Sequence, residues 1–233
     1  MLMVLLIVAI VSGALVIGAL WGLYGKLPTR LEGFLVSIAG GALVISAVSE
    51  LIEPTAENTS ILTAVVWTLV GAAIFTGCDY LIDKYWGESQ GGGLLAAITL
   101  DGIPENLALG VALIGAEPLQ VAALAGSILL SNLPEAAGGA KEMRGNDMAK
   151  SKALMLWVGT ALLLSAAALA GNILLSEAGE TTLGAIKCVA GGAVVASLAA
   201  EVFPKAYNED RNFAGFATAL GFLLALWLGQ IGK

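Results

Sequence analysis

The chain has 233 residues, of which 58% are hydrophobic and only 12% charged, and its mean hydropathy is +0.89. Soluble domains carry about 25% charged residues, so this composition argues against a soluble protein and indicates one built for a lipid bilayer. The formal net charge of −7 gives no reason to expect a nucleic-acid partner, and the complete absence of histidine removes the commonest zinc and copper ligand.

Apolar runs separated by short polar breaks predict an all-α, polytopic membrane protein with eight transmembrane helices. Each run reaches the length of about 20 residues that a membrane span needs. Because the connections are short, we expect one transmembrane domain over residues 1–233 and no separate soluble domain. The predicted spans cover approximately residues 2–24, 31–53, 60–82, 93–115, 119–142, 152–175, 181–204 and 212–231.

Basic residues collect on one side of these predicted helices. The connections after spans one, three, five and seven carry Lys26, Arg30, Lys84, Lys141, Arg144, Lys150, Lys152, Lys205 and Arg211. The opposite side carries only Lys233, while Lys187 lies within the seventh span. The positive-inside rule then places the basic side in the cytoplasm and both termini outside. We expect a multi-pass protein of a prokaryotic plasma (inner) membrane, in contact with membrane lipid.

A segment of the second span recurs in the seventh. Ala39–Ser46 reads AGGALVIS, Ala190–Ser197 reads AGGAVVAS, and Glu50 then aligns with Glu201. The two spans run in opposite directions, which predicts inverted repeats that join spans one to three with six to eight in a 3+2+3 arrangement. The alternative is chance similarity between helices rich in small residues. The predicted repeats cover approximately 1–115 and 119–233, with central helices 93–115 and 119–142.

Two segments place a proline and a carboxylate inside apolar runs: Leu100–Glu105 (LDGIPE) and Leu130–Glu135 (LSNLPE). A carboxylate is expensive in hydrocarbon, so an intramembrane Asp or Glu is a candidate functional residue. The prolines Pro104 and Pro134 also leave a backbone carbonyl one turn earlier without its helical partner. We therefore predict a cation-binding site where these two helices meet.

The spacing of the polar residues gives the candidate ligands. Asp101 and Glu105 are four residues apart and share one helix face, as do Ser131 and Glu135. Carboxylates gathered in a dehydrated pocket need a compensating cation, for which a divalent metal or a proton is preferred over the distant Lys187. The predicted metal ligands are Asp101, Glu105, Ser131, Asn132 and Glu135, with Asn106 as a further amide oxygen.

Other polar residues suggest a path to this site. Ser49, Glu50 and Glu53 fall toward the outer end of the second span and predict an outer vestibule. Glu201, near the inner end of the seventh span, predicts an exit. A snorkelling role at the membrane surface is the alternative for these side chains.

The two segments resemble the ZIP family of divalent-metal transporters. Asp101–Ala108 (DGIPENLA) matches the family pattern His-Asn-x-Pro-Glu-Gly-Leu-Ala, and Ser131–Ala136 (SNLPEA) matches His-Glu/Asp-x-Pro-Glu-Gly/Glu. The resemblance implies the eight helices, the 3+2+3 arrangement, the outward termini and a metal site on the fourth and fifth helices. It also implies that Glu105 and Glu135 stand where the family has its glutamates.

The departures from the family pattern change the expected ligands. Asp101 and Ser131 stand where the family has histidine, while Gly102 and Asn132 replace its asparagine and second acid. The expected ligand shell is thus all oxygen, which suits Mn²⁺, Fe²⁺, Mg²⁺ or Ca²⁺ better than Zn²⁺. The same replacements argue against the second metal seen in parts of the family.

The sequence therefore predicts a passive or secondary transporter that moves a divalent metal ion inward by alternating access. No phosphate-binding loop is present to couple transport to a nucleotide. The alternatives are a relative that carries protons or another cation, and a structural or regulatory membrane protein that does not transport. An intramembrane aspartyl hydrolase needs two neighbouring aspartates, and only Asp101 lies deep in a span, so we do not expect an enzyme. Small-residue faces at Gly40–Gly41 and Gly191–Gly192 fit either packing within one chain or a homodimer.

Overall fold

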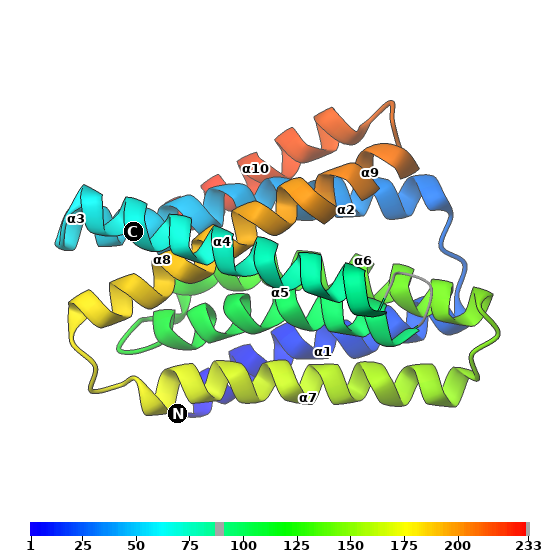
Figure 1. The fold of residues 1–233 in the computed structure, drawn as a ribbon, viewed down its shortest axis with the longest axis horizontal. Helices are drawn as coiled ribbons and strands as arrows, with labels where there is room; N and C mark the ends of the chain where they lie inside the picture. The colour runs from blue at the N-terminus through cyan, green and yellow to red at the C-terminus, as the bar shows by residue number, and fades with distance from the viewer. Residues whose placement is uncertain (87–90, 232–233) are drawn as a thin grey trace.

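The computed structural model describes residues 1–86 and 91–231, and these are almost entirely helical, with no strand (Figure 1). The all-α class predicted from the sequence is confirmed. The elements are α1 (Leu2–Tyr24), α2 (Thr29–Ser46), η1 (Ala47–Ile52), α3 (Glu53–Asn58), α4 (Ile61–Trp86), α5 (Gly91–Ala112), η2 (Pro118–Val121), α6 (Ala122–Gly145), α7 (Lys150–Leu174), α8 (Glu180–Ser197), η3 (Leu198–Val202), α9 (Phe203–Glu209) and α10 (Ala214–Ile231).

Seven helical stretches within the described residues are long and apolar enough to cross a membrane. Three of them are composite, because η1 and α3 continue α2, η2 leads into α6, and η3 and α9 continue α8. Helix α5 corresponds to the remaining predicted span and is 22 residues long. Its first residues, up to residue 98, lie outside the part whose side chains the structure describes. The multi-pass membrane character is thus confirmed.

The predicted helix ends at residues 53 and 204 are wrong. The predicted spans of approximately 31–53 and 181–204 end beside or at a proline, whereas the helices continue through Pro54 and Pro204 into α3 and α9. A π-helical stretch, η1 or η3, precedes each proline, which then occupies the first turn of the next helical segment. Because the helix is continuous here, each proline leaves a carbonyl of the preceding turn without an N–H donor. The wider π turn supplies the adjustment that lets the chain run on.

The helices pack as two groups. In the first group α1 packs on α6 and α7, and α5 packs on α7; in the second, α2 packs on α10 and α4 on α8. The groups meet where α2 contacts α6, where α5 contacts α8, and more narrowly where α4 meets α5 and α10 meets α6. In Figure 1, α1 and α7 lie along one side of the molecule and α2, α9 and α10 along the other.

Glycines bring the helices of the second group into backbone contact. A Cβ on any of four of them would overlap a carbonyl oxygen of the facing helix. These contacts join Gly41 to Thr218, Gly221 to Ile38, Gly192 to Thr68, and Gly71 to Val189. Gly41 and Gly192, for which the sequence left open packing within the chain or against a second copy, are therefore occupied by contacts within the chain.

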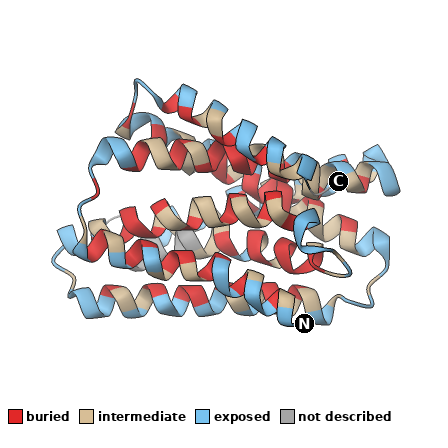
Figure 2. Cartoon of the chain, turned by 180° about the vertical axis from the view of Figure 1, so that it is seen from behind, coloured by how far each residue is buried: buried red, intermediate tan, exposed pale blue. Residues whose placement is uncertain are grey.

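Buried residues lie where helices face each other, and exposed residues lie on the outward faces (Figure 2). Many of the exposed residues are large and apolar. Leu62, Leu69, Leu162, Phe216 and Trp227 are each more than half exposed. In a soluble protein such a surface would cause aggregation, but in a bilayer it faces acyl chains.

The two ends of the bundle differ in charge. One end, called the basic end below, holds the α1–α2, α6–α7 and α9–α10 connections and the helix ends beside them, where the basic residues collect. The other, the acidic end, holds the α3–α4, α5–η2 and α7–α8 connections together with both termini (Figure 1).

Candidate functional site

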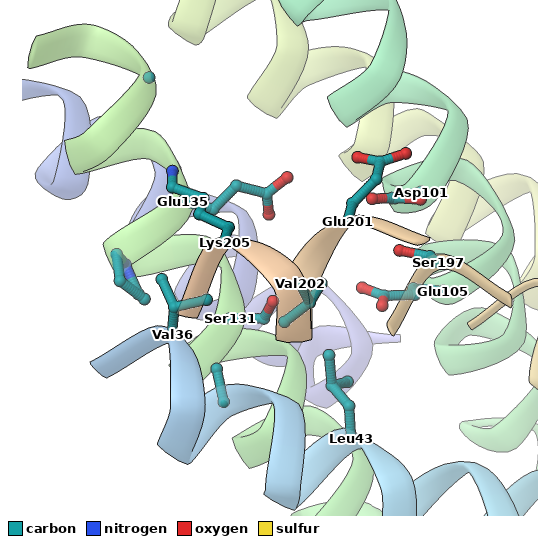
Figure 3. A pocket seen from close by; sticks show the side chains of 13 residues that line it. Val36, Leu43, Asp101, Glu105, Ser131, Glu135, Ser197, Glu201, Val202 and Lys205 are labelled. Atoms are coloured by element: carbon teal, nitrogen blue, oxygen red, sulfur yellow. The ribbon is translucent and has the colours of Figure 1, made fainter. Parts of the chain in front are cut away.

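A cavity of about 120 Å³ lies where the two helix groups meet, and its lining residues run from the middle of the helices toward the basic end. Figure 3 shows the side chains that line it. Its walls carry four carboxylates and one amine. The lining residues are Val36, Ala39 and Leu43 of α2, Asp101 and Glu105 of α5, Ser131, Pro134, Glu135 and Gly139 of α6, and Ser197, Glu201, Val202 and Lys205 of the α8–η3–α9 segment.

The spacing along two helices brings most of the predicted site together. Asp101 and Glu105 face the cavity from α5, and Ser131 and Glu135 face it from α6. Both helices continue through their prolines, which lie inside them rather than at their ends. Because residues four apart share a helix face, each helix presents a pair of oxygen-bearing side chains to the same space.

The carboxylates sit in a poorly solvated environment. Glu105 is only 8% exposed. Asp101 lies near enough to Glu201, Glu135 and Glu105 to experience electrostatic repulsion from all three, and the Ser197 side chain lies beside it in the cavity wall. One oxygen of Asp101 and one of Glu201 are buried with no hydrogen-bond partner among the described residues. Buried carboxylate oxygens left without donors favour binding of a cation.

The carboxylates surround the cavity without converging on one point. Within the described residues, no three His, Cys, Asp or Glu side chains lie close enough together to hold a metal ion. A single ion seated here would require side-chain movement to gather the oxygens.

Two predicted ligands do not line the cavity. The Asn132 amide donates to the carbonyl of Val11 in α1, at 3.0 Å, and the Asn106 amide donates to the carbonyl of Gly102, at 2.9 Å. Each asparagine is one position after a cavity-lining residue, Glu105 or Ser131, and its side chain is therefore turned by about 100° around the helix. Their amides serve helix packing and the helix backbone.

Of the predicted path residues, only Glu201 reaches the cavity. It lines the wall itself, and its carboxyl group lies close to that of Asp79 of α4. Glu50 lies instead beside Gly229 of α10 and interacts electrostatically with Lys187.

The other two path residues lie farther out. The Ser49 hydroxyl donates to the carbonyl of Ile45, at 2.9 Å, and Glu53 is exposed. The predicted outer vestibule is therefore not continuous with the cavity.

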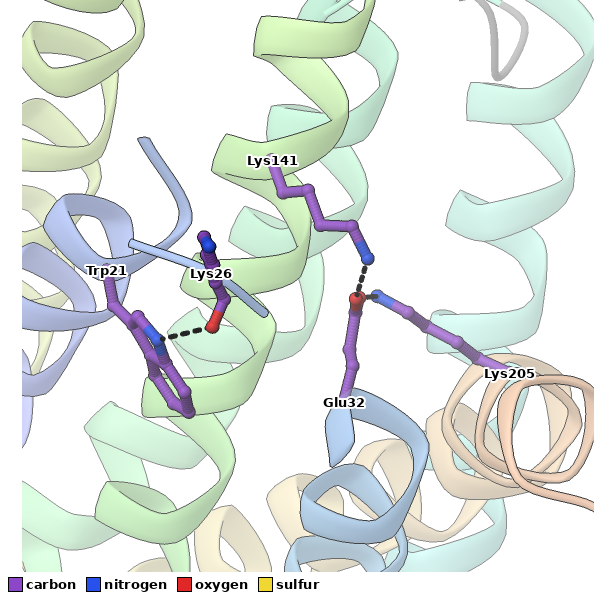
Figure 4. A network of polar contacts seen from close by, with 5 residues as sticks. All are labelled: Trp21, Lys26, Glu32, Lys141 and Lys205. Atoms are coloured by element: carbon purple, nitrogen blue, oxygen red, sulfur yellow. Dashed lines mark hydrogen bonds and ion pairs between the residues drawn. The ribbon is translucent and has the colours of Figure 1, made fainter. Parts of the chain in front are cut away.

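Sequence reasoning missed the ion network at the basic rim of the cavity (Figure 4). Buried Glu32 of α2 accepts from Lys141 of α6 at 2.9 Å and pairs with Lys205 of α9 at 3.2 Å. The two lysines had been used only to assign topology. Lys205 follows Glu201 by four residues, a spacing that places it on the same helix face and gave a usable signal. Nothing local links Glu32 to Lys141, which is 109 residues away.

Comparison with known protein families finds no family model that matches the chain, and a search of curated proteins finds none with significant similarity.

Proposed function

We propose that this protein is a secondary transporter that carries a divalent metal cation across the membrane, with the central cavity as its cargo site. One observation carries the proposal: Glu105 and Glu135, from helices that cross the bundle in opposite directions, line one polar cavity inside an otherwise apolar bundle. Acidic side chains at such depth are costly to maintain and mark cation pathways in membrane proteins.

The ligand chemistry points to the harder divalent ions. Asp101, Glu105, Ser131 and Glu135 offer only oxygen atoms, and Glu201 adds another carboxylate to the wall. Mn²⁺, Fe²⁺, Mg²⁺ and Ca²⁺ accept such a shell more readily than Zn²⁺ does. The cavity is narrow and has no preformed ligand cluster among the described side chains. The side chains would therefore have to close around the ion before carboxylate oxygens replace its water ligands.

The proposed mechanism is alternating access by inverted repeats in a 3+2+3 arrangement, over approximately 1–115 and 119–233. Mirrored packing supports it. The α2–α10 contact corresponds to α8–α4, α1–α6 to α7–α5, and α2–α6 to α8–α5. Both η1 and η3 precede a proline, and they carry the aligned glutamates Glu50 and Glu201. Transporters of this kind bind cargo at the repeat interface and move one helix group against the other.

The position of the cavity supports an orientation. The cavity extends toward the basic end, and that end faces the cytoplasm under the positive-inside rule. We therefore propose an inward-facing state, with both termini outside and inward movement of the ion down its gradient and the membrane potential. A prokaryotic inner membrane is the proposed location.

The resemblance to ZIP transporters rests on the double Pro-Glu pattern around Pro104 and Pro134. The cavity gives that pattern a physical basis, because the glutamates after both prolines line its wall. We propose a divergent, histidine-free relative of that family.

The test is metal uptake by proteoliposomes that contain the purified chain. Glu105→Gln combined with Glu135→Gln removes two carboxylates at nearly constant volume, and we expect uptake of Mn²⁺ to fall about a hundredfold. Glu117→Gln is the matched control, since it removes a carboxylate from the α5–η2 connection, away from the cavity. Unchanged uptake in the double variant would reject the site.

A second candidate is transport of protons or a monovalent cation by the same fold. It is favoured by the lack of a metal-ready cluster among the described side chains and by an amine, Lys205, in the cavity wall. Proton flux without any effect of divalent ions would favour this candidate over metal transport.

A further inference from the structure

Lys205 is the one basic side chain among the described residues that line the cavity. It faces four carboxylates there, so it already neutralises part of the charge that the cargo would neutralise. Its place in the wall makes it a competitor for the cargo.

The ammonium of Lys205 has acidic groups on two sides, with Glu32 and Glu209 at the rim and Glu135 inside the cavity. Its Nζ is 3.2 Å from Glu32 at the rim, and it also attracts Glu135 inside the cavity (Figures 3 and 4). The Lys205 side chain is 41% exposed, which leaves its flexible four-carbon stem free to change rotamer.

Glu32 does not depend on Lys205 for neutralisation. Lys141 pairs with the other oxygen of the same carboxylate at 2.9 Å, so Glu32 stays paired when Lys205 turns away. This second lysine removes most of the penalty that breaking a buried ion pair would otherwise impose.

A glycine keeps the space between the two acids open. Gly138 lies three residues after Glu135 and one turn before Lys141 on α6. A Cβ at this position would overlap the Glu32 carboxylate and come within 2.9 Å of Lys205 Nζ. Any side chain there would crowd the ammonium between Glu32 and Glu135.

We propose that Lys205 is a tethered cation, whose ammonium turns from Glu32 to Glu135 when the cargo leaves and so permits the empty carrier to reorient. The inference rests on the proposed transport function and adds a residue to it. Without this substitute cation, the empty carrier would have to reorient while its carboxylates carry negative charge that no cation neutralises. A dehydrated environment disfavours such unpaired charge. Loaded carrier needs no such help, because the metal itself neutralises the site.

Two assays on the same proteoliposomes separate these steps. Net uptake of Mn²⁺ into metal-free vesicles requires return of the empty carrier, whereas tracer exchange with Mn²⁺ on both sides does not. For Lys205→Met we expect net uptake to fall on the order of tenfold, the low end for an uncompensated charge because Lys205 is partly exposed, while exchange stays near the wild-type rate. Lys205→Arg, which keeps the charge, should restore net uptake in part.

Two further variants complete the test. Lys152→Met removes a charge from an exposed position at the same end and should change neither assay. Gly138→Ala keeps every charge but narrows the path, and it should slow net uptake selectively; it decides the question if Lys205→Met does not fold.

The outcomes separate the two proposals. Parallel loss of net uptake and exchange in Lys205→Met, or no loss in either, overturns the tethered-cation role while leaving metal transport standing. Absence of both activities in the wild-type chain rejects metal transport and the role of Lys205 together.

Discussion

The two ends of the bundle are formed by the same two helix groups, but the groups pack differently at each end. Toward the basic end, the helix groups separate around a cavity with four carboxylates. Toward the acidic end, the same groups close on a cluster of buried apolar side chains that includes Val11, Leu51, Leu109, Leu124 and Ile128. No residue of this acidic-half cluster other than Leu43 lines the cavity.

The aligned glutamates make the contrast concrete. Glu201 lies in the cavity wall, whereas Glu50 lies beside α10 and interacts with Lys187. Equivalent positions with different surroundings are what an alternating-access protein requires in one of its two states, since exchanging the states exchanges the surroundings. Under the proposed mechanism, the difference between the two ends would be a property of the conformation as much as of the sequence.

A disulfide that holds the two helix groups together in the acidic half should have the largest effect on metal uptake. The hydroxyl oxygens of buried Ser46 and Ser127 are 2.7 Å apart and join α2 to α6 across the two helix groups. Ser46→Cys with Ser127→Cys places two thiols within disulfide reach. We expect oxidation to reduce metal uptake to background, because the acidic half can no longer open, and reduction to restore it.

All variants carry Cys78→Ser, because Cys78 is partly exposed, whereas Cys188 is buried and is kept. The controls are Ser46→Cys alone and Ser127→Cys alone in this background. Cross-linking is measured by intact mass under each condition. Full uptake by the cross-linked protein would show that the acidic half need not open.

Neutralising the glutamate in the cavity wall, compared with neutralising the aligned glutamate outside it, should have the next largest effect. We expect Glu201→Gln to lower uptake about tenfold, because it removes a carboxylate from the cavity wall. Glu50→Gln is the matched variant and should lower it by less than about threefold, since Glu50 lies outside the wall. Uptake rates at saturating and limiting Mn²⁺ measure both changes. Equal losses would remove the distinction between the two halves.

Helical spacing was sufficient to predict four of the polar residues in the cavity wall. Asp101, Glu105, Ser131 and Glu135 come from two local patterns, and each pattern fixes a helix face without knowledge of the rest of the fold. The same geometry argues against Asn106, which is one position beyond Glu105. Its inclusion as a ligand weighed side-chain chemistry above direction.

The rest of the site depends on tertiary packing. Glu32 meets Lys141 and Lys205 only because α2, α6 and α9 converge at the basic end. Pro54 likewise signals a helix end when read locally, whereas the preceding π turn allows the helix to continue. Apart from the Glu201–Lys205 spacing, which places Lys205 on the face of the cavity, neither feature has a pattern in neighbouring residues that sequence reasoning could detect.

Acidification should reduce metal uptake by protonating the carboxylates of the cavity. Carboxylates bind a metal ion in their deprotonated form, so protons compete with the cargo and uptake should fall severalfold as the pH is lowered from about 8 to about 5. The sign is the informative part: uptake that rises on acidification would mean that protons accompany the cargo. Initial rates in vesicles clamped at equal pH on both sides measure the effect without a proton gradient.

Charge at the acidic surface should matter least. Glu53 is exposed near this end, and its carboxylate raises the local concentration of cations rather than binding one. We expect Glu53→Gln to lower uptake at limiting Mn²⁺ by less than about twofold, and the difference to vanish when salt screens the surface charge. A loss that persists at high salt would instead make Glu53 part of a continuous outer pathway, and the closed acidic half would then have to contain a route for the ion that its apolar packing now obstructs.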